Sequence, residues 1–344
     1  MRKRVTAITT MTVVAAIVAA CGSSSSVSHN SNTTHATPAA QTAATSGESV
    51  LMGHFLGPYM VDVAQREHLT TNLHLHLATL ASGSAALPLM LSGRMDGVTD
   101  IGVPPLVTAA AQHVPLKIVW YSGNDPAGIY VKPQIKTAKQ LAGQNLAAPA
   151  GSIAQIALAE YLNQQGVGFS NVHFVNLPPG SIVASYKTGQ IAGASIWTPV
   201  TTGLHAAGAK LMANQPETAF TVFASSFVSK HPGAVQAYLC DIARAQDFRR
   251  SNPSRVYADL APAEGTSAKG VEAEMPTNPP SNQTAADVMG TAGHPPAGQV
   301  SQIVEAGQTM TKLGLIPNAP SASTVRSMFD PQFAEYIAAG KCAK

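Results

Sequence analysis

One stretch decides the fold class: residues 145–162 read NLAAPAGSIAQIALAEYL. The run Asn145–Ala148 predicts a short strand, which Pro149 to Gly151 interrupt. Ser152 then stands where a helix N-cap belongs, and apolar residues recur at helical spacing at Ile153, Ile156, Ala157 and Tyr161. A strand that enters a helix through a Gly/Pro turn is the unit of an α/β fold.

The same alternation extends outward in both directions. Further strands are predicted at Val50–Phe55, Leu73–Ala78, Leu116–Tyr121, Ile129–Val131, Val172–Asn176, Gly193–Trp197 and Phe220–Ala224. Further helices are predicted after two breaks, Gly57-Pro58 and His231-Pro232, the second through Val235, Leu239 and Ile242. No repeat of about 20 to 50 residues is visible, so the sequence does not indicate a solenoid.

Composition excludes several other classes of protein. The chain has 344 residues, 45% of them hydrophobic and 11% charged, which fits two globular domains and excludes a disulfide miniprotein, a collagen and a disordered chain. The net charge of +3 comes from Arg2, Lys3 and Arg4, because the remaining 18 basic residues match the 18 acidic ones. Nucleic-acid binding is therefore not expected, since it requires clustered basic residues.

The N-terminus has the pattern of a secretory signal. Basic residues precede the apolar run Val5–Ala20, which is too short for a confident membrane span, so residues 1–20 are predicted to be a signal peptide. The tetrapeptide Val18-Ala19-Ala20-Cys21 resembles a bacterial lipobox, in which the cysteine receives lipid and becomes the mature N-terminus. The alternative is an ordinary signal with an incidental Cys21. Residues 21–49, rich in Ser, Thr, Asn and Ala, are predicted to be a flexible tether.

Two further cysteines, Cys240 and Cys342, remain in a compartment that permits disulfides. One bridge between them is possible, and the sequence alone leaves it open.

Seven motifs carry a resemblance to a known family. In chain order they are Leu91-Ser92-Gly93 through Asp100-Ile101-Gly102, Ile129–Pro133, Leu141–Ala147, Gly151–Ala154, Val175–Pro179, Gly189–Pro199 and Lys230-His231-Pro232. Together they resemble the taurine, nitrate and alkanesulfonate substrate-binding proteins of ABC importers, over roughly residues 50 to 315. The resemblance implies a type 2 periplasmic-binding-protein fold, in which two α/β lobes close on a ligand in the cleft.

The expected lobe boundaries follow from this resemblance. The first lobe is expected to comprise residues 50–130 and 223–344, and the second lobe residues 131–222. The two crossovers are then expected near Tyr130-Val131 and near Thr221 to Phe223.

Candidate ligand-binding residues lie where strands enter helices or where the resemblance places the cleft. The Ser152 hydroxyl and the first amides of the following helix suit an anion such as a sulfonate, carboxylate or nitrate, although Ser152 alternatively only caps its helix. The resemblance places Trp197 at the cleft; the alternative for Trp197 is core packing. The candidates are His54, Phe55, Leu56, Gly102, Val103, Ser152, Ile153, Ser195, Trp197 and Thr198.

Departures from the taurine-binding relatives shape the expected ligand. Ala192 matches an aspartate in those relatives, and an acidic residue also lies near the position of Ala219. Ile153 replaces a threonine, and the loop from Gly102 to Leu106 is shorter and contains two prolines. Since these carboxylates would balance a ligand ammonium, a zwitterion such as taurine is disfavoured. The sequence favours a neutral or weakly anionic organic ligand with an apolar part.

Other readings are weaker. His74 and His76 alternate on one strand, near His54 and His68 in sequence, but solvent-facing histidines explain the pattern better than a metal site, and no metal is expected. A Pro-rich stretch from Pro262 to Pro296, with His294, is predicted to be a surface excursion. The chain lacks the cysteine-rich motif of the thiamine-pyrimidine enzymes that share this fold, and the common hydrolase and nucleotide motifs, so neither an enzyme nor a cofactor is expected.

The predicted protein is an extracytoplasmic solute-binding lipoprotein of an ABC importer. It is expected to be a monomer that is held at the membrane by its lipid and passes a small organic solute to a permease. The alternatives are a receptor that presents its ligand to a membrane sensor, and a binding protein for a thiamine-pyrimidine precursor.

Overall fold

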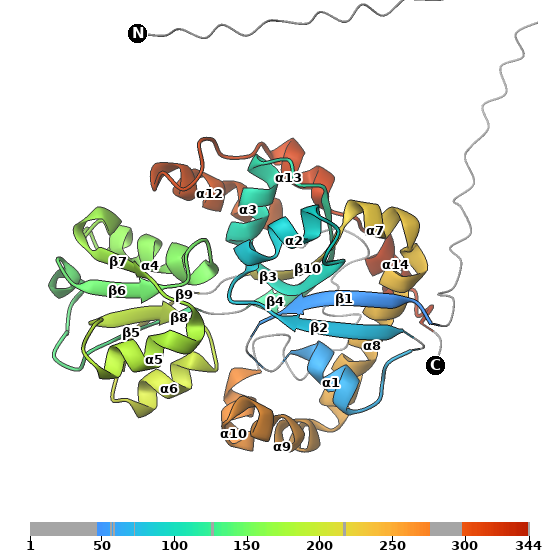
Figure 1. Ribbon diagram of the computed structural model, residues 1–344, viewed down its shortest axis with the longest axis horizontal. Helices are drawn as coiled ribbons and strands as arrows, with labels where there is room; N and C mark the ends of the chain where they lie inside the picture. The colour runs from blue at the N-terminus through green and yellow to red at the C-terminus, as the bar shows by residue number, and fades with distance from the viewer. Residues whose placement is uncertain are drawn as a thin grey trace, which may run out of the picture. The chain divides into compact units, whose positions relative to one another are not determined.

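The computed structural model describes residues 47 to 342, apart from positions 56, 58, 72, 125–126, 216–217 and 276–297. The predicted signal peptide, Cys21, Leu56 and His294 lie outside the described residues. Two five-stranded sheets make up the described part of the chain, each with its own helices; the first packs on one apolar core and the second on two apolar clusters (Figure 1).

The first sheet has the strand order β2-β1-β3-β10-β4. Its strands are β1 (Ser49–His54), β2 (His74–Thr79), β3 (Gly97–Gly102), β4 (Leu116–Asn124) and β10 (Thr218–Ala224). Strand β1 pairs in parallel with β2 and β3, whereas β10 runs antiparallel to both of its neighbours, β3 and β4. Every residue of β3 and of β10 is buried, as expected of central strands that are covered on both faces.

The helices of the first lobe come from both ends of the described chain. They are α1 (Met60–Arg66), η1 (Gly83–Ala85), α2 (Leu87–Leu91), α3 (Val103–Ala111), α7 (Ser225–Lys230), α8 (Pro232–Ser251), α9 (Pro253–Glu264), α10 (Ala268–Glu274), α12 (Gln299–Lys312), α13 (Ala322–Met328) and α14 (Gln332–Ala338). Their buried side chains join those of the sheet in one core that spans residues 50 to 337. The first lobe is therefore discontinuous in sequence.

The second sheet has the order β7-β6-β8-β5-β9. Its elements are β5 (Ala127–Val131), η2 (Ala138–Leu141), β6 (Asn145–Ala148), α4 (Ile153–Gln164), η3 (Phe169–Asn171), β7 (His173–Asn176), α5 (Pro179–Lys187), β8 (Gly193–Ile196), α6 (Val200–Ala206) and β9 (Lys210–Gln215). Strand β6 pairs in parallel with β7 and β8, and it leads into α4, as the α/β pattern predicted.

The crossovers lie earlier in the chain than the sequence suggested. The chain changes sheets between Asn124 and Ala127 and again between Gln215 and Thr218. Tyr130-Val131 instead lies inside β5, paired with β8 and β9, and Thr221 to Phe223 lie inside β10. The expected positions were wrong because both lie within apolar runs, whose sheet membership depends on pairing with distant strands.

One segment expected to be a loop is helical, and the described part of the predicted surface excursion, up to residue 275, is largely helical too. The residues after Gly102 form the first turn of α3, where Pro104 and Pro105 are tolerated because the first amides of a helix need no intrahelical partner. The Pro-rich stretch begins inside α9, which contains Pro262, and continues through α10. Strands β3 and β9 were not predicted.

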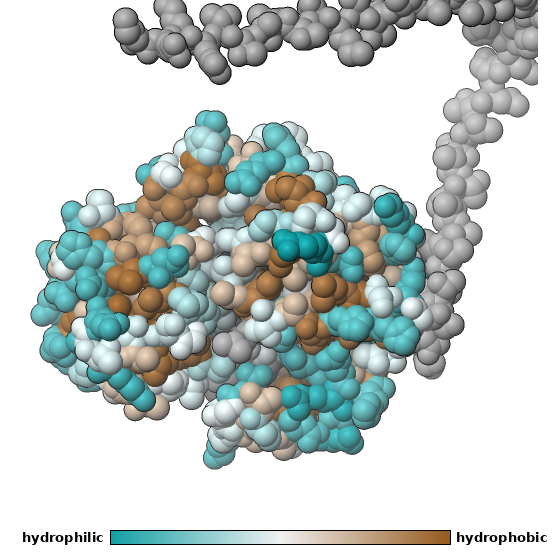
Figure 2. All heavy atoms as spheres, in the orientation of Figure 1, coloured by the Kyte–Doolittle hydropathy of each residue, from teal (hydrophilic) through white to brown (hydrophobic). Residues whose placement is uncertain are grey.

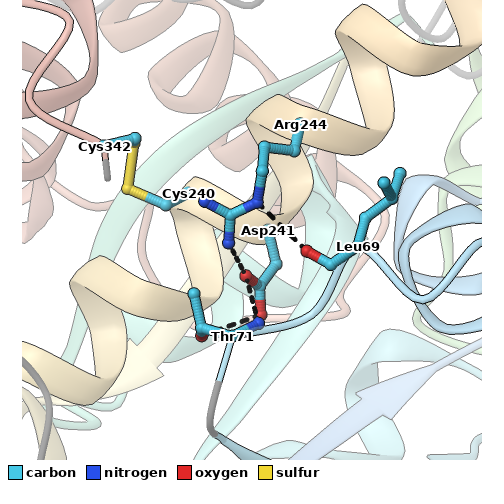
Figure 3. Close-up of a disulfide and its surroundings, with 6 residues drawn as sticks. All are labelled: Leu69, Thr71, Cys240, Asp241, Arg244 and Cys342. Atoms are coloured by element: carbon cyan, nitrogen blue, oxygen red, sulfur yellow. Dashed lines mark hydrogen bonds and ion pairs between the residues drawn. A yellow bond between two sulfur atoms is a disulfide. The ribbon is translucent and has the colours of Figure 1, made fainter. Parts of the chain in front are cut away.

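A disulfide joins Cys240 of α8 to Cys342, with a Cα–Cα distance of 5.5 Å (Figure 3). Beside it, Asp241 accepts hydrogen bonds from the Thr71 backbone amide at 2.9 Å and from Arg244. The Arg244 Nε–H donates to the Leu69 carbonyl at 3.1 Å. These contacts hold the C-terminal end of the chain and the loop before β2 against α8.

The surface in view mixes polar and apolar side chains (Figure 2). Among the described residues, the large exposed hydrophobic side chains are Leu91, Leu211 and Leu315, which lie far apart in the sequence. Within the same residues, no helix combines the length and the apolar character that a membrane crossing requires.

Candidate functional site

A pocket lies between the two lobes, which both contribute to its walls. Phe55, Tyr59, Gly83, Asp100, Gly102 and Pro105 come from the first lobe, and Ser152, Ile153 and Trp197 come from the second. Its empty space, counted with the part that opens to solvent, is about 290 Å³. Phe55, Gly102 and Trp197 follow or end strands β1, β3 and β8, at the carboxyl edges where open α/β sheets bind ligands. We call it the cleft pocket.

Ser152 and Ile153 bring the N-terminus of α4 to the cleft pocket. The Ser152 hydroxyl makes no cap; it donates to the Pro149 carbonyl at 2.6 Å, while Gln155 Oε1 accepts from the Gly151 amide at 2.7 Å. The proposed capping role of Ser152 is therefore wrong. The first amides of a helix have no intrahelical acceptor and carry its positive dipole end, so this wall favours an electronegative ligand group.

Two aromatic side chains from different lobes meet at the cleft pocket. The rings of Phe55 and Trp197 lie 6.4 Å apart at 73°, in an edge-to-face arrangement. Trp197 is 5% exposed, and its Nε1–H has no hydrogen-bond acceptor among the described residues. A buried indole N–H normally has a partner, so a ligand acceptor would satisfy it. Trp197 also packs in the core of the second lobe, so it both lines the cleft pocket and contributes to that core.

A carboxylate lies in the first-lobe wall, at Asp100. This residue is buried and has a φ of +54° within β3, a conformation in which aspartate is found more often than most residues. The Thr99 hydroxyl donates to Asp100 Oδ2 at 3.2 Å. Asp100 was not among the predicted site residues; the signal available was an acidic residue inside an apolar run near the end of a strand.

The lobes touch directly at two glycines beside the cleft pocket. The Ser84 hydroxyl of η1 donates to the Gly151 carbonyl at 2.6 Å, across the cleft. A Cβ added at Gly102 would lie 1.9 Å from Ile153 Cγ2, and one added at Gly151 would lie 2.4 Å from Ser84 Oγ. Glycine at both positions therefore permits this close approach of the lobes.

Four described candidates do not line the cleft pocket. His54 Nε2 lies 3.1 Å from Thr79 Oγ1, and burial lowers the pKa of its imidazole. Val103 belongs to the first-lobe core, and Ser195 is fully buried in β8. Thr198 Oγ1 lies 3.1 Å from Thr201 Oγ1. Tyr59, Gly83, Asp100 and Pro105 line the pocket but were not among the candidates.

The argument from Ala192 does not apply to this pocket. Ala192 precedes β8, at the end of the strand opposite Trp197, where its amide donates to the Asn145 carbonyl at 2.8 Å and its carbonyl accepts from the Lys132 amide at 2.9 Å. Ala219 pairs with Gly102, near the cleft. Asp100 nevertheless places a carboxylate in the pocket wall, from a strand that was not predicted.

The histidines of β2 are exposed. His74 and His76 point to solvent on an edge strand of the first sheet. In the part of the chain that the structure describes, no three His, Cys, Asp or Glu side chains come together in a metal-binding arrangement.

Comparisons with known proteins agree with this architecture. A model of the NMT1-like family matches residues 59–259. The taurine-binding periplasmic protein of Escherichia coli (strain K12) is 30% identical over 182 residues, which cover 50% of this chain and 56% of that protein. The match thus spans little more than half of that relative's length.

Solved structures show the same fold. The alkanesulfonate-binding protein SsuA from Xanthomonas axonopodis pv. citri, bound to MOPS, matches with a TM-score of 0.68 and 19% identity, over 84% of this chain and 99% of that chain. The periplasmic nitrate-binding protein NrtA from Synechocystis PCC 6803 matches with a TM-score of 0.69 and 13% identity, over 87% and 90%.

These structures confirm the predicted two-lobed periplasmic-binding-protein fold. The family match extends across both lobes and more than half of the sequence. The chain therefore belongs to the NMT1-like family.

Proposed function

We propose that this protein is the extracytoplasmic solute-binding component of an ABC importer, which captures a small organic solute in the cleft pocket and delivers it to a membrane permease. The observation that carries the proposal is that both lobes build the walls of one pocket. The taurine-binding relative is a periplasmic binding protein, and the SsuA and NrtA neighbours are binding proteins of the same fold.

Lobe closure would couple capture to delivery. A ligand that contacts Asp100 on one lobe and Trp197 on the other gains both sets of interactions only when the lobes are closed. Solute binding therefore shifts the population towards the closed form. The size of this shift is set by how much more tightly the solute binds the closed form than the open form. A permease that engages the closed form would then select the loaded protein.

Binding without chemistry suits the residues of this pocket. Ser152 is the one serine among the described lining residues, and its hydroxyl donates to the Pro149 carbonyl. A serine nucleophile needs a neighbouring base, and the lining set contains no histidine or lysine. We therefore propose no reaction on the solute.

The pocket walls indicate the chemistry of the solute. The α4 N-terminus and the Trp197 N–H favour an electronegative group, while Asp100 favours a hydrogen-bond donor or a cation. The aromatic rings between them suit an apolar or planar body. An amine-bearing solute is thus no longer disfavoured, and a flat heterocycle such as a pyrimidine precursor is a second candidate.

A ligand panel tests this function. The soluble domain, cut near Gly47, is heated with taurine, ethanesulfonate, nitrate, aromatic sulfonates, carboxylates and pyrimidines. A solute at a hundred times its dissociation constant should stabilise the protein by about 2.7 kcal/mol. Stabilisation by an organic member, lost in Trp197→Ala, supports the proposal; no stabilisation by any organic member contradicts it.

We further propose that Cys21 carries the lipid that anchors the protein. The support is the sequence pattern alone, a basic start, an apolar run and the Val18-Ala19-Ala20-Cys21 tetrapeptide. Cys21→Ser should release the protein from the membrane fraction of a bacterial expression host and abolish incorporation of labelled fatty acid. Membrane association that survives this change contradicts the anchor.

A further inference from the structure

A second cavity lies inside the first lobe, behind the cleft pocket. It is lined by Tyr59, Met60, Thr99, Asp100, Trp120, Ser122, Thr221, Ile242 and Gln246. Tyr59 and Asp100 line both spaces, so the two are neighbours separated by these side chains. We call the second space the inner chamber.

Two irregularities in the sheet aim polar residues at the inner chamber. Between β3 and β10, the residues Thr99 and Asp100 lie opposite the single residue Thr221. Between β10 and β4, Ser122 is the extra residue, because Phe220 pairs with Tyr121 and Ala219 with Gly123. Such β-bulges redirect side chains and occur beside functional sites more often than elsewhere.

The three strands each contribute a hydroxyl to this place. Thr99 Oγ1 and Ser122 Oγ each lie 3.3 Å from Thr221 Oγ1, and the three residues are 3%, 6% and 1% exposed. Central strands covered on both faces are usually apolar, because a buried hydroxyl destabilises the fold unless it is hydrogen-bonded. Here the three hydroxyls bond one another in a row that ends at the Asp100 carboxylate, which gives the inner chamber a polar wall able to bond a further polar group.

The charge of the lining residues determines which kind of ligand group can bind in the inner chamber. Asp100 is the charged residue among the described lining residues, and it is an acid. Arg249 is the buried cation among the described residues; its guanidinium donates to the Met275 carbonyl at 3.0 Å and to Gln246 Oε1 at 3.2 Å, and it does not line the chamber. An anionic group would face the Asp100 carboxylate without a lining cation, whereas an amine or a hydroxyl would donate to it.

We propose that the inner chamber is a subsite for the donor end of the solute, an amine or a hydroxyl, which passes Asp100 and hydrogen-bonds Thr99, Thr221 and Ser122. The apolar body of the same solute lies against Phe55 and Trp197 in the cleft pocket. This inference rests on the proposed function and narrows its substrate class to amphipathic molecules with an uncharged or cationic donor end.

Matched probes test the subsite. Calorimetry with 2-phenylethylamine, 2-phenylethanol and phenylacetate compares a cationic, a neutral and an anionic end on one apolar body. We expect the amine and the alcohol to bind and the carboxylate to bind at least tenfold more weakly. Thr221→Val and, separately, Ser122→Ala should weaken the amine and the alcohol about twofold to tenfold, the loss typical of one hydrogen bond.

Thr311→Val is the matched control, because its hydroxyl donates to the Gly307 carbonyl within α12, outside both spaces. It should leave all three affinities unchanged. The melting point of each variant shows whether it is folded. If Thr221→Val does not fold, Ser122→Ala alone decides the test.

Two results would refute the subsite. The first is that the probes bind with affinities that neither variant changes, and the second is a crystal structure with the amine that shows only water in the inner chamber. In both cases the proposed function still stands. The subsite is also contradicted if phenylacetate binds as tightly as 2-phenylethylamine and 2-phenylethanol. If no probe and no organic panel member binds, the proposed function fails together with the subsite.

Discussion

Replacing Gly102 by alanine should weaken solute binding because it destabilises only the closed form of the protein. Gly102 has a φ of −73°, which alanine adopts freely, so the backbone is not strained. The new Cβ would lie 1.9 Å from Ile153 Cγ2, whereas carbon atoms in contact lie about 3.5–4.0 Å apart. The lobes must therefore separate locally by about 1.5 to 2 Å, or Ile153 must repack.

The magnitude follows from the usual cost of overpacking. An extra methyl group in a well-packed contact costs about 1–3 kcal/mol. Because Gly102 and Ile153 belong to different lobes, this cost falls on the closed form and not on the folding of either lobe. At 1.4 kcal/mol for each factor of ten, the dissociation constant should rise about 5- to 150-fold, while the melting point without solute changes little.

The assay is titration calorimetry with the solute that the panel identifies, together with small-angle scattering to follow lobe closure. Gly180→Ala is the control, since a Cβ there meets no atom within 4 Å. Ile153→Ala removes Cγ2 and so relieves the clash. The double variant Gly102→Ala/Ile153→Ala should therefore bind more tightly than the sum of the two single effects predicts. An unchanged dissociation constant and unchanged closure in Gly102→Ala would refute the reasoning.

Three further predictions concern the pocket, the disulfide and buried acids. Trp197→Ala should raise the solute dissociation constant at least tenfold in calorimetry, with circular dichroism unchanged; equal affinity would remove Trp197 from the site. Cys240→Ser opens a bridge across 102 residues of sequence and should lower the free energy of unfolding by up to about 4.7 kcal/mol in urea titrations, an effect absent when both proteins are reduced. Burial raises the pKa of Asp62 and of Asp241 to about 6 and that of Glu264 to about 7. The folded state therefore binds protons more tightly than the unfolded state, so stability should increase as the pH falls from 7.5 to 5; a higher urea midpoint at pH 7.5 would contradict this.

Local pattern determined the elements that the sequence predicted well. Strand β6 spans the predicted residues Asn145–Ala148, and α4 begins directly after Ser152, because apolar spacing and the glycine break at Gly151, with a φ of +68°, act within a few residues. The alternation of such units also specified an α/β chain, and the order of the family motifs indicated its two lobes.

The chemistry of the site was less predictable. Phe55, Gly102, Ser152, Ile153 and Trp197 were predicted and line the cleft pocket, since all of them end strands or begin helices. Predicting from a motif failed for Ala192, which lies at the far end of β8 from Trp197. The motif fixes its position in the chain, but only the direction of the strand decides which end faces the cleft.

By itself, the sequence determined the α/β class, most strands, three of the helices and about half of the pocket residues, because these depend on the spacing of neighbouring residues. Only the tertiary structure decided that β10 lies between β3 and β4, which brings Thr99 beside Thr221 across 122 positions of sequence. The same pairing forms the bulge that turns Asp100 into the pocket wall. Strand pairing depends on backbone hydrogen bonds between distant segments, which leave no periodic signal in either segment alone.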